Sequence, residues 1–72
     1  MATNNTLQIR VNGEPRDVAA GLSISEMLGA MGLNPRKVAV ERNLEIVPRS
    51  TLGQVRVEDG DAFEIVHFVG GG

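Results

Sequence analysis

The sequence of 72 residues predicts one small α+β domain, a mixed sheet of four to five strands with one main helix packed on one face. Three features indicate this: apolar and polar residues alternate near the N-terminus, a capping box opens a helical pattern, and an apolar run stands near the C-terminus. The predicted order is strand, strand, helix, strand, short strand, strand. A helix that crosses between a hairpin and later strands packs on one face of a mixed sheet, so this order predicts the β-grasp, or ubiquitin-like, architecture.

The first two strands are predicted from alternation and from a turn signal. Leu7, Ile9 and Val11 alternate with polar residues, as in a half-buried strand. Asn12-Gly13 follows at once and is a strong signal for a hairpin turn. The return strand, roughly residues 15–18, begins with a proline that has no N–H to donate, which favours a position at the sheet edge.

The helix is predicted from its start, its periodicity and its stop. Ser23 and Glu26 have the spacing of a capping box, and Gly32 supplies a left-handed end. The apolar positions follow the i, i+3, i+4, i+7 rule at Ile24, Met27, Leu28 and Met31. Because a helix of about two turns is marginal alone, packing on the sheet must hold it.

The later elements are read from shorter patterns. Residues 38–41 predict a third strand, and residues 44–47 a short fourth strand before a proline. Leu52 is expected to plug the bottom of the core. Residues 58–61, EDGD, predict a tight turn that leads into the last strand, residues 63–69. That strand is apolar on both faces, so we expect a central strand or a strand with one face covered by a partner.

The composition excludes several classes of site. The chain has no cysteine, which removes disulfides, thiolate metal sites and a thiol nucleophile, and a single histidine, His67, argues against a histidine-rich metal site. A net charge of −2 with only two aromatic residues indicates neither nucleic acid nor an anionic membrane as a partner. Residues 1–5 lack the basic and apolar regions of a signal peptide, so we expect a cytoplasmic protein with no bound metal.

No group of residues predicts catalysis. Ser23 and Ser25 are explained as helix-cap residues, and no local motif links His67 to either serine. Asp59 and Asp61 have the spacing of a turn and not of a catalytic pair. We therefore expect that the chain is not an enzyme and binds no cofactor stably.

The three terminal glycines stand out because glycine loses the most conformational freedom on ordering. Without Cβ atoms, Gly70, Gly71 and Gly72 suit a narrow channel, and the Gly72 carboxylate is unobstructed. Joined to AMP at the expense of ATP, that carboxylate becomes a mixed anhydride, open to conversion to a thioester, a thiocarboxylate or an amide. Three frayed residues remain the alternative. We divide the chain into a flexible extension at 1–5, a domain at 6–69 and a flexible tail at 70–72.

Alternation along the last strand predicts a surface for a partner. The helix-facing side is assigned to Phe63, Ile65 and His67, and the open side to Glu64, Val66 and Phe68. Exposed Val66 and Phe68 beside the tail predict an apolar patch of the kind that binds a partner. Arg42 and Arg49 are expected to border it; packing of Phe68 in the core and ordinary solvated arginines stay open as alternatives.

The segments VAVERNLEIVPRS and VEDGDAFEIVHFVGGG resemble the sulfur carrier proteins of thiamine biosynthesis, the ThiS family, and the resemblance runs from Leu7 onward. Its most specific pieces are IVPR, DGD and the final Gly71-Gly72. The resemblance implies that an adenylyltransferase of the ubiquitin-activating type uses ATP to adenylate Gly72, and that a sulfurtransferase system then supplies sulfur. The resulting thiocarboxylate serves a thiazole synthase, with Gly70 and Gly71 as the tail that enters partner active sites.

Three alternatives remain. The small subunit of molybdopterin synthase also ends in Gly-Gly, but it typically has prolines before the tail, and HFVGGG has none. A protein modifier joins its terminal glycine to other proteins through isopeptide bonds. A binding module with an idle tail is the third.

Overall fold

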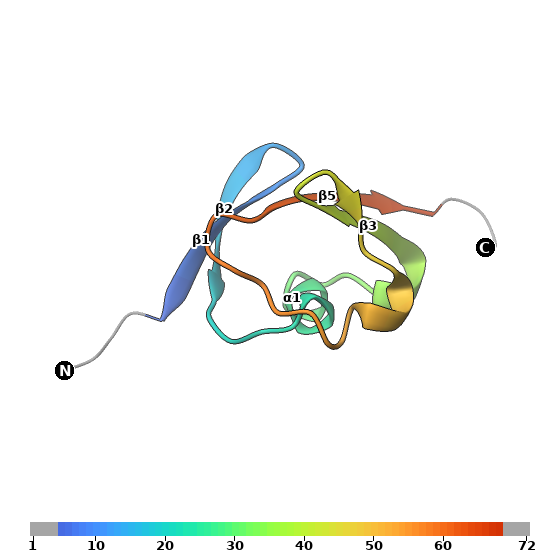
Figure 1. The fold of residues 1–72 in the computed structure, drawn as a ribbon, viewed down its shortest axis with the longest axis horizontal. Coiled ribbons are helices and arrows are strands. Elements are labelled where there is room, and N and C mark those ends of the chain that lie inside the picture. The colour runs from blue at the N-terminus through green and yellow to red at the C-terminus, as the bar shows by residue number, and fades with distance from the viewer. Residues whose placement is uncertain (1–4, 69–72) are drawn as a thin grey trace.

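The structure, a computed structural model, describes residues 5–68. In this part of the chain one sheet has the order β2-β1-β5-β3-β4, with β1 and β5 parallel and the other neighbours antiparallel. Helix α1 lies across one face of it (Figure 1). The elements are β1 Thr6–Val11, β2 Glu14–Ala19, α1 Ile24–Ala30, β3 Val38–Arg42, β4 Glu45–Ile46 and β5 Ala62–His67, with 3-10 turns at Pro35–Lys37 and Arg49–Thr51. The β-grasp prediction is confirmed.

The first hairpin follows the predicted chemistry. Asn12 and Gly13 both have positive φ, 51° and 85°, as a two-residue type I′ turn requires. Strand β2 pairs with β1 alone, so Pro15 lies in an edge strand as expected. The strand is longer than predicted because its register with β1 continues to the pair Thr6 and Ala19.

Asn12 also extends the pairing between β1 and β5. The ladder of these parallel strands has only two residue pairs, and it ends at Val11 and Phe63. Beyond it the Asn12 backbone N–H donates to the Phe63 carbonyl at 2.8 Å. The Asn12 side-chain amide accepts from the Ile65 N–H at 2.8 Å and donates to the Ile65 carbonyl at 3.2 Å. One side chain therefore takes the place of a further β1 residue.

Helix α1 has the predicted caps at both ends. The Ser23 hydroxyl accepts from the Glu26 N–H at 3.0 Å, and the Glu26 carboxylate accepts from the Ser23 N–H at 2.9 Å. At the other end Gly32 has a φ of 81°, and the Leu33 N–H donates to the Leu28 carbonyl at 2.9 Å, as in a Schellman motif. The short helix is thus bounded by its own residues before any packing is considered.

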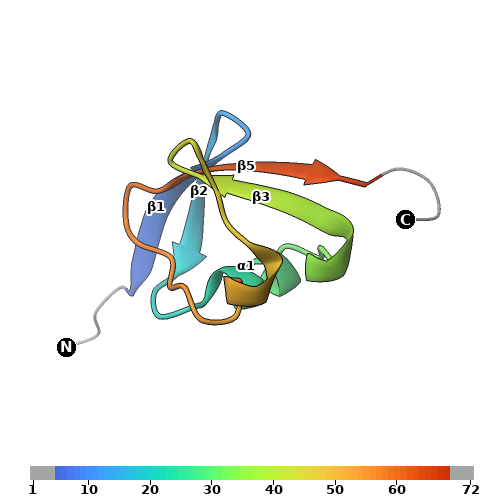
Figure 2. The ribbon, with the colours of Figure 1, turned by 45° about the vertical axis from the view of Figure 1, so that its right-hand side comes forward.

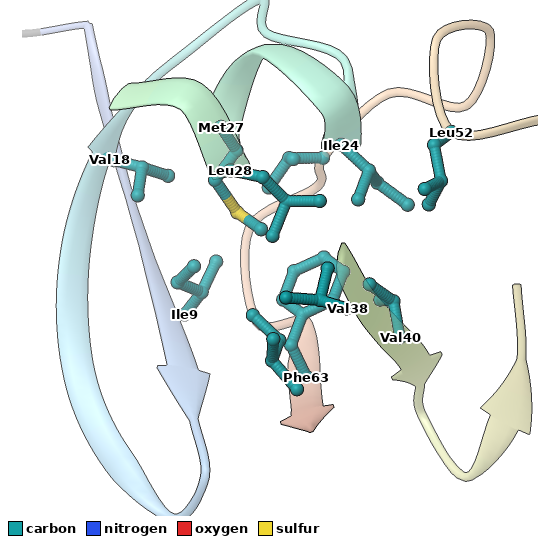
Figure 3. Packing of buried hydrophobic residues seen from close by; sticks show 11 residues of the cluster. Ile9, Val18, Ile24, Met27, Leu28, Val38, Val40, Leu52 and Phe63 are labelled. Carbon is teal, nitrogen blue, oxygen red and sulfur yellow. The ribbon is translucent and has the colours of Figure 1, made fainter. Parts of the chain in front are cut away.

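A single core fills the space between α1 and the sheet (Figure 3). The helix contributes Ile24, Met27 and Leu28, each with no exposed surface. Leu52 is buried in this core, as predicted. The remaining buried apolar residues come from the strands and the last connection: Ile9, Val18, Val38, Val40, Val57, Phe63 and Ile65.

The fourth strand differs from its prediction. Strand β4 contains only Glu45 and Ile46, and Leu44 belongs to the turn before it. The pairing of Arg42 with Glu45 leaves two residues for the turn, and both of them, Asn43 and Leu44, have positive φ, 53° and 72°. Leu44 is 90% exposed in this left-handed conformation. Leu44 is apolar and so fits a strand pattern, but the two-residue hairpin places it in the turn.

Substitution Leu44→Gly should stabilise the fold by about 0.5–1 kcal/mol. The left-handed conformation costs a residue with a Cβ atom roughly 1–2 kcal/mol, part of which returns as extra freedom of glycine in the unfolded chain. Urea unfolding monitored by circular dichroism measures the change. Leu44→Ala, which keeps the Cβ atom, is the matched control and should be nearly neutral; equal effects of both variants would show that turn strain is not the cause.

Candidate functional site

The face of the sheet opposite α1 carries the candidate site. Figure 2 shows α1 on one side of β3 and β5, with no helix of the described chain over the other side. Cross-strand partners share a face of a sheet, so the register defines the exposed rows. In one row Ile46, Glu41 and Glu64 lie side by side on β4, β3 and β5. In the next row Ala39 pairs with Val66.

The alternation predicted for β5 is found between Phe63 and Val66. Phe63 and Ile65 are buried, whereas Glu64 and Val66 are exposed. His67 pairs with buried Val38, so it lies on the helix-facing side as assigned, but it is exposed at the end of β5. Strand β5 ends there, before the residue Val69 that the prediction included. Gly70, Gly71 and Gly72 lie outside the described residues.

Phe68 is held at the end of the strand and remains 47% exposed. Its backbone N–H donates to the Lys37 carbonyl at 3.0 Å. The Arg49 guanidinium lies 5.1 Å from the centre of its ring, and the same side chain donates to the Val38 carbonyl at 3.3 Å. Arg49 therefore borders the patch through a cation–π contact. Packing of Phe68 in the core is ruled out.

Arg42 does not border the patch. Even-numbered β3 residues point to the helix side, and Arg42 lies 3.8 Å from the Asp61 carboxylate on that side. It also donates to the Arg56 carbonyl at 3.2 Å. The expectation that Arg42 borders the patch is therefore wrong. Alternation along β3 by itself places Arg42 on the helix side.

Asp61 is a structural residue, as its place in a turn predicts. It is 5% exposed, and its carboxylate accepts from the Glu58 N–H at 2.9 Å and from the Asn43 amide at 3.1 Å. Asp59 accepts from the Gln8 N–H at 2.8 Å, which attaches the same turn to β1. Among residues 5–68 no group of three or more acidic or histidine side chains is arranged to hold a metal ion.

The site contains residues that the sequence patterns did not identify. Ile46 is 77% exposed and Glu41 is half-buried, and both lie beside Glu64 on the open face. The two-residue strand β4 is too short for its alternation to be recognised, so only the pairing register reveals the position of Ile46. Alternation along β3 already places Glu41 on the side opposite Val38 and Val40. Within the described chain, no helix is long and apolar enough to cross a membrane.

Comparison with known proteins gives a consistent set of relatives. The sequence model of the ThiS family matches residues 9–72. A thiazole synthase of Paramagnetospirillum magneticum is 53% identical over 66 residues, which are 92% of this chain but only 20% of that protein. The sulfur carrier protein ThiS of Bacillus subtilis is 44% identical over 50 residues, 69% of this chain and 76% of the relative.

A solved structure agrees with these relatives. The crystal structure of the thiamine biosynthesis protein ThiS from Geobacter metallireducens has a TM-score of 0.78 and 38% identity. The alignment covers 92% of this chain and all of that one.

Replacing Asp61 by alanine should destabilise the protein by about 2–3 kcal/mol, because the part-buried hydrogen bonds from the Asn43 amide and the Glu58 N–H lose their charged acceptor. Asp59→Ala, which removes one exposed hydrogen bond of the same turn, should cost about 1 kcal/mol or less. Thermal unfolding of both variants at neutral pH measures the difference. A similar loss in both would contradict a structural role particular to Asp61.

Proposed function

The chain belongs to the ThiS family, and on this basis we propose that it carries sulfur for thiamine biosynthesis on the carboxylate of Gly72. The observation that supports the proposal most directly is the family match over residues 9–72, which includes the glycine tail.

The proposed chemistry uses the polypeptide itself as the acyl group. A carboxylate is a poor acyl donor, so an adenylyltransferase of the ubiquitin-activating type first joins Gly72 to AMP and releases pyrophosphate from ATP. A sulfurtransferase system then supplies sulfur at the oxidation level of sulfide, which attacks the acyl carbon, displaces AMP and leaves a thiocarboxylate. ATP is a substrate of the partner enzyme, and the carrier supplies no catalytic residue. Because ATP is required, we propose a cytoplasmic location.

The position of β5 supports this role. The strand lies between β1 and β3, and its buried Phe63 and Ile65 fix it to the core. Four residues follow Phe68 in the sequence, a length of at most about 13 Å when extended. A strand fixed to the core and followed within a few residues by glycines is well suited to present a chain end to an enzyme pocket.

The exposed part of β5 supports a partner surface beside the tail. We propose that Glu64, Val66 and Phe68 contact the enzymes that act on Gly72. Val66 is 61% exposed and Phe68 47%, so both have apolar area to bury. A thiazole synthase that contains a segment 53% identical to this chain supports such an enzyme as the sulfur acceptor.

Incubation with ATP, the activating enzyme and a sulfur donor should produce a chain heavier by the mass difference between sulfur and oxygen. Intact mass spectrometry measures the product, and fragmentation places the sulfur on Gly72. A variant that lacks Gly71-Gly72 is the control; it should fold normally and acquire no sulfur. Chains linked to other proteins would instead identify a modifier, and sulfur on the truncated variant would contradict the assignment to Gly72.

Substitution Val66→Thr should weaken binding to a partner enzyme about tenfold, because a hydroxyl replaces a methyl group in the contact and is buried without a partner. Threonine keeps the strand preference, so stability should change little. Val11→Thr makes the same change on the helix-facing side, where Val11 packs against the core. It should lower stability and leave affinity unchanged. Calorimetric titration measures the affinity of both variants, and thermal unfolding measures their stability. Loss of affinity in Val11→Thr but not in Val66→Thr would exclude Val66 from the interface.

A further inference from the structure

The open face of β3, β4 and β5 combines apolar residues with a pair of like charges. We define the β3–β5 face by its exposed and half-buried strand residues, Ala39, Glu41, Ile46, Glu64 and Val66; Phe68 follows just beyond the end of β5. Glu41 and Glu64 are direct cross-strand partners. Side chains at such positions have Cβ atoms about 4.5–5.5 Å apart, and like charges placed there destabilise a sheet.

No cation of the described chain relieves this pair. Within residues 5–68 neither carboxylate takes part in an ion pair or a side-chain hydrogen bond. The arginines on the neighbouring strands and turn are engaged elsewhere. Arg10 on β1 donates to the Gly13 carbonyl at 3.3 Å, and Arg42 pairs with Asp61 on the helix side. Arg49 contacts the Phe68 ring and the Val38 carbonyl. The repulsion between the Glu41 and Glu64 carboxylates is therefore not offset by an ion pair within the described chain.

The surroundings of the pair decide what can cover it. Ile46 lies beside Glu41 across the strands, and Val66 follows Glu64 on the same face of β5. A protein that buries Ile46 and Val66 must also remove water from the two carboxylates between them. Burying unpaired charges costs far more than the apolar contacts return, so a surface without a cation is rejected.

We propose that the β3–β5 face binds the thiazole synthase through an arginine of that enzyme, which inserts between Glu41 and Glu64. The guanidinium has donors in a planar fork that can serve two carboxylates at once, and its apolar stem can lie against Ile46 and Val66. The choice of enzyme rests on the proposed function and on the relative in which a similar segment is part of a thiazole synthase. Glu64 lies on the strand that leads to the glycine tail, so one enzyme can contact both Glu64 and the tail.

The double substitution E41Q/E64Q tests this inference because stability and binding should change in opposite directions. Removing the repulsion should raise the melting temperature by roughly 1–3 °C. Affinity for the thiazole synthase of the same organism should fall at least tenfold, since a buried arginine loses both charged partners. The dependence of affinity on sodium chloride concentration should also weaken.

The control is E45Q/E58Q, which makes the same change in net charge at two exposed glutamates away from the β3–β5 face. Its affinity should stay within about twofold of the unsubstituted protein, as expected for charges outside an interface. Equal losses in both double variants would overturn the inference, because net charge alone would then explain the binding. Undiminished affinity of E41Q/E64Q, or no measurable binding by the unsubstituted protein, would also overturn it.

Two further measurements test for self-association of the chain and for loss of the carrier reaction. Sedimentation of the unsubstituted chain should show a monomer; a dimer lost in E41Q/E64Q would assign the face to a second copy and overturn the proposal. Thiocarboxylate formation on the unsubstituted chain is measured in the same preparation. If no thiocarboxylate forms on the unsubstituted chain, the proposed function fails, whereas the binding comparison still decides the role of the glutamate pair.

Discussion

Strand β5 must lie between β1 and β3 for the core and the open face to form, and polar side chains secure it on both sides. On the β3 side, Asn43 forms two hydrogen bonds with Ala62, one through its backbone N–H and one through its side-chain oxygen. On the β1 side, the Asn12 amide pairs with both backbone groups of Ile65. Buried Asp61 connects the turn before the strand to Asn43.

This arrangement gives β5 two separate tasks. Its helix-facing residues, Phe63 and Ile65, belong to the core that holds α1. Its opposite face leaves Val66 exposed and places Glu64 against another glutamate. In a domain of this size every buried apolar side chain matters for stability, because the fraction of surface buried on folding is modest. Apolar side chains left outside the core are therefore better explained by contact with another protein than by folding.

The same division is compatible with the carrier role that we propose. The sheet side that packs on α1 can stay unchanged while a partner protein approaches the other side. Apolar contact alone discriminates poorly between partners, whereas a pair of carboxylates makes any partner without a cation unfavourable. In the proposed complex the glutamate pair thus favours a partner that brings a cation to the β3–β5 face.

Elements whose signals are local could be predicted from the amino-acid sequence alone. The Asn12-Gly13 turn, the capping box of Ser23 and Glu26, and the stop at Gly32 depend on residues a few positions apart, and all three are found in the structure. The resemblance to the sulfur carriers likewise followed from short motifs, and the family match agrees with it.

Only the tertiary structure decided which residues far apart in the sequence contact one another. The turn at Asn43 and Leu44, the engagement of Arg42 with Asp61, and the row of Ile46, Glu41 and Glu64 all depend on register between strands. A shift of one residue in register moves every side chain to the other face of a sheet. Alternation can tell which residues of one strand share a face, but hydrogen bonding between strands sets which residues lie beside them.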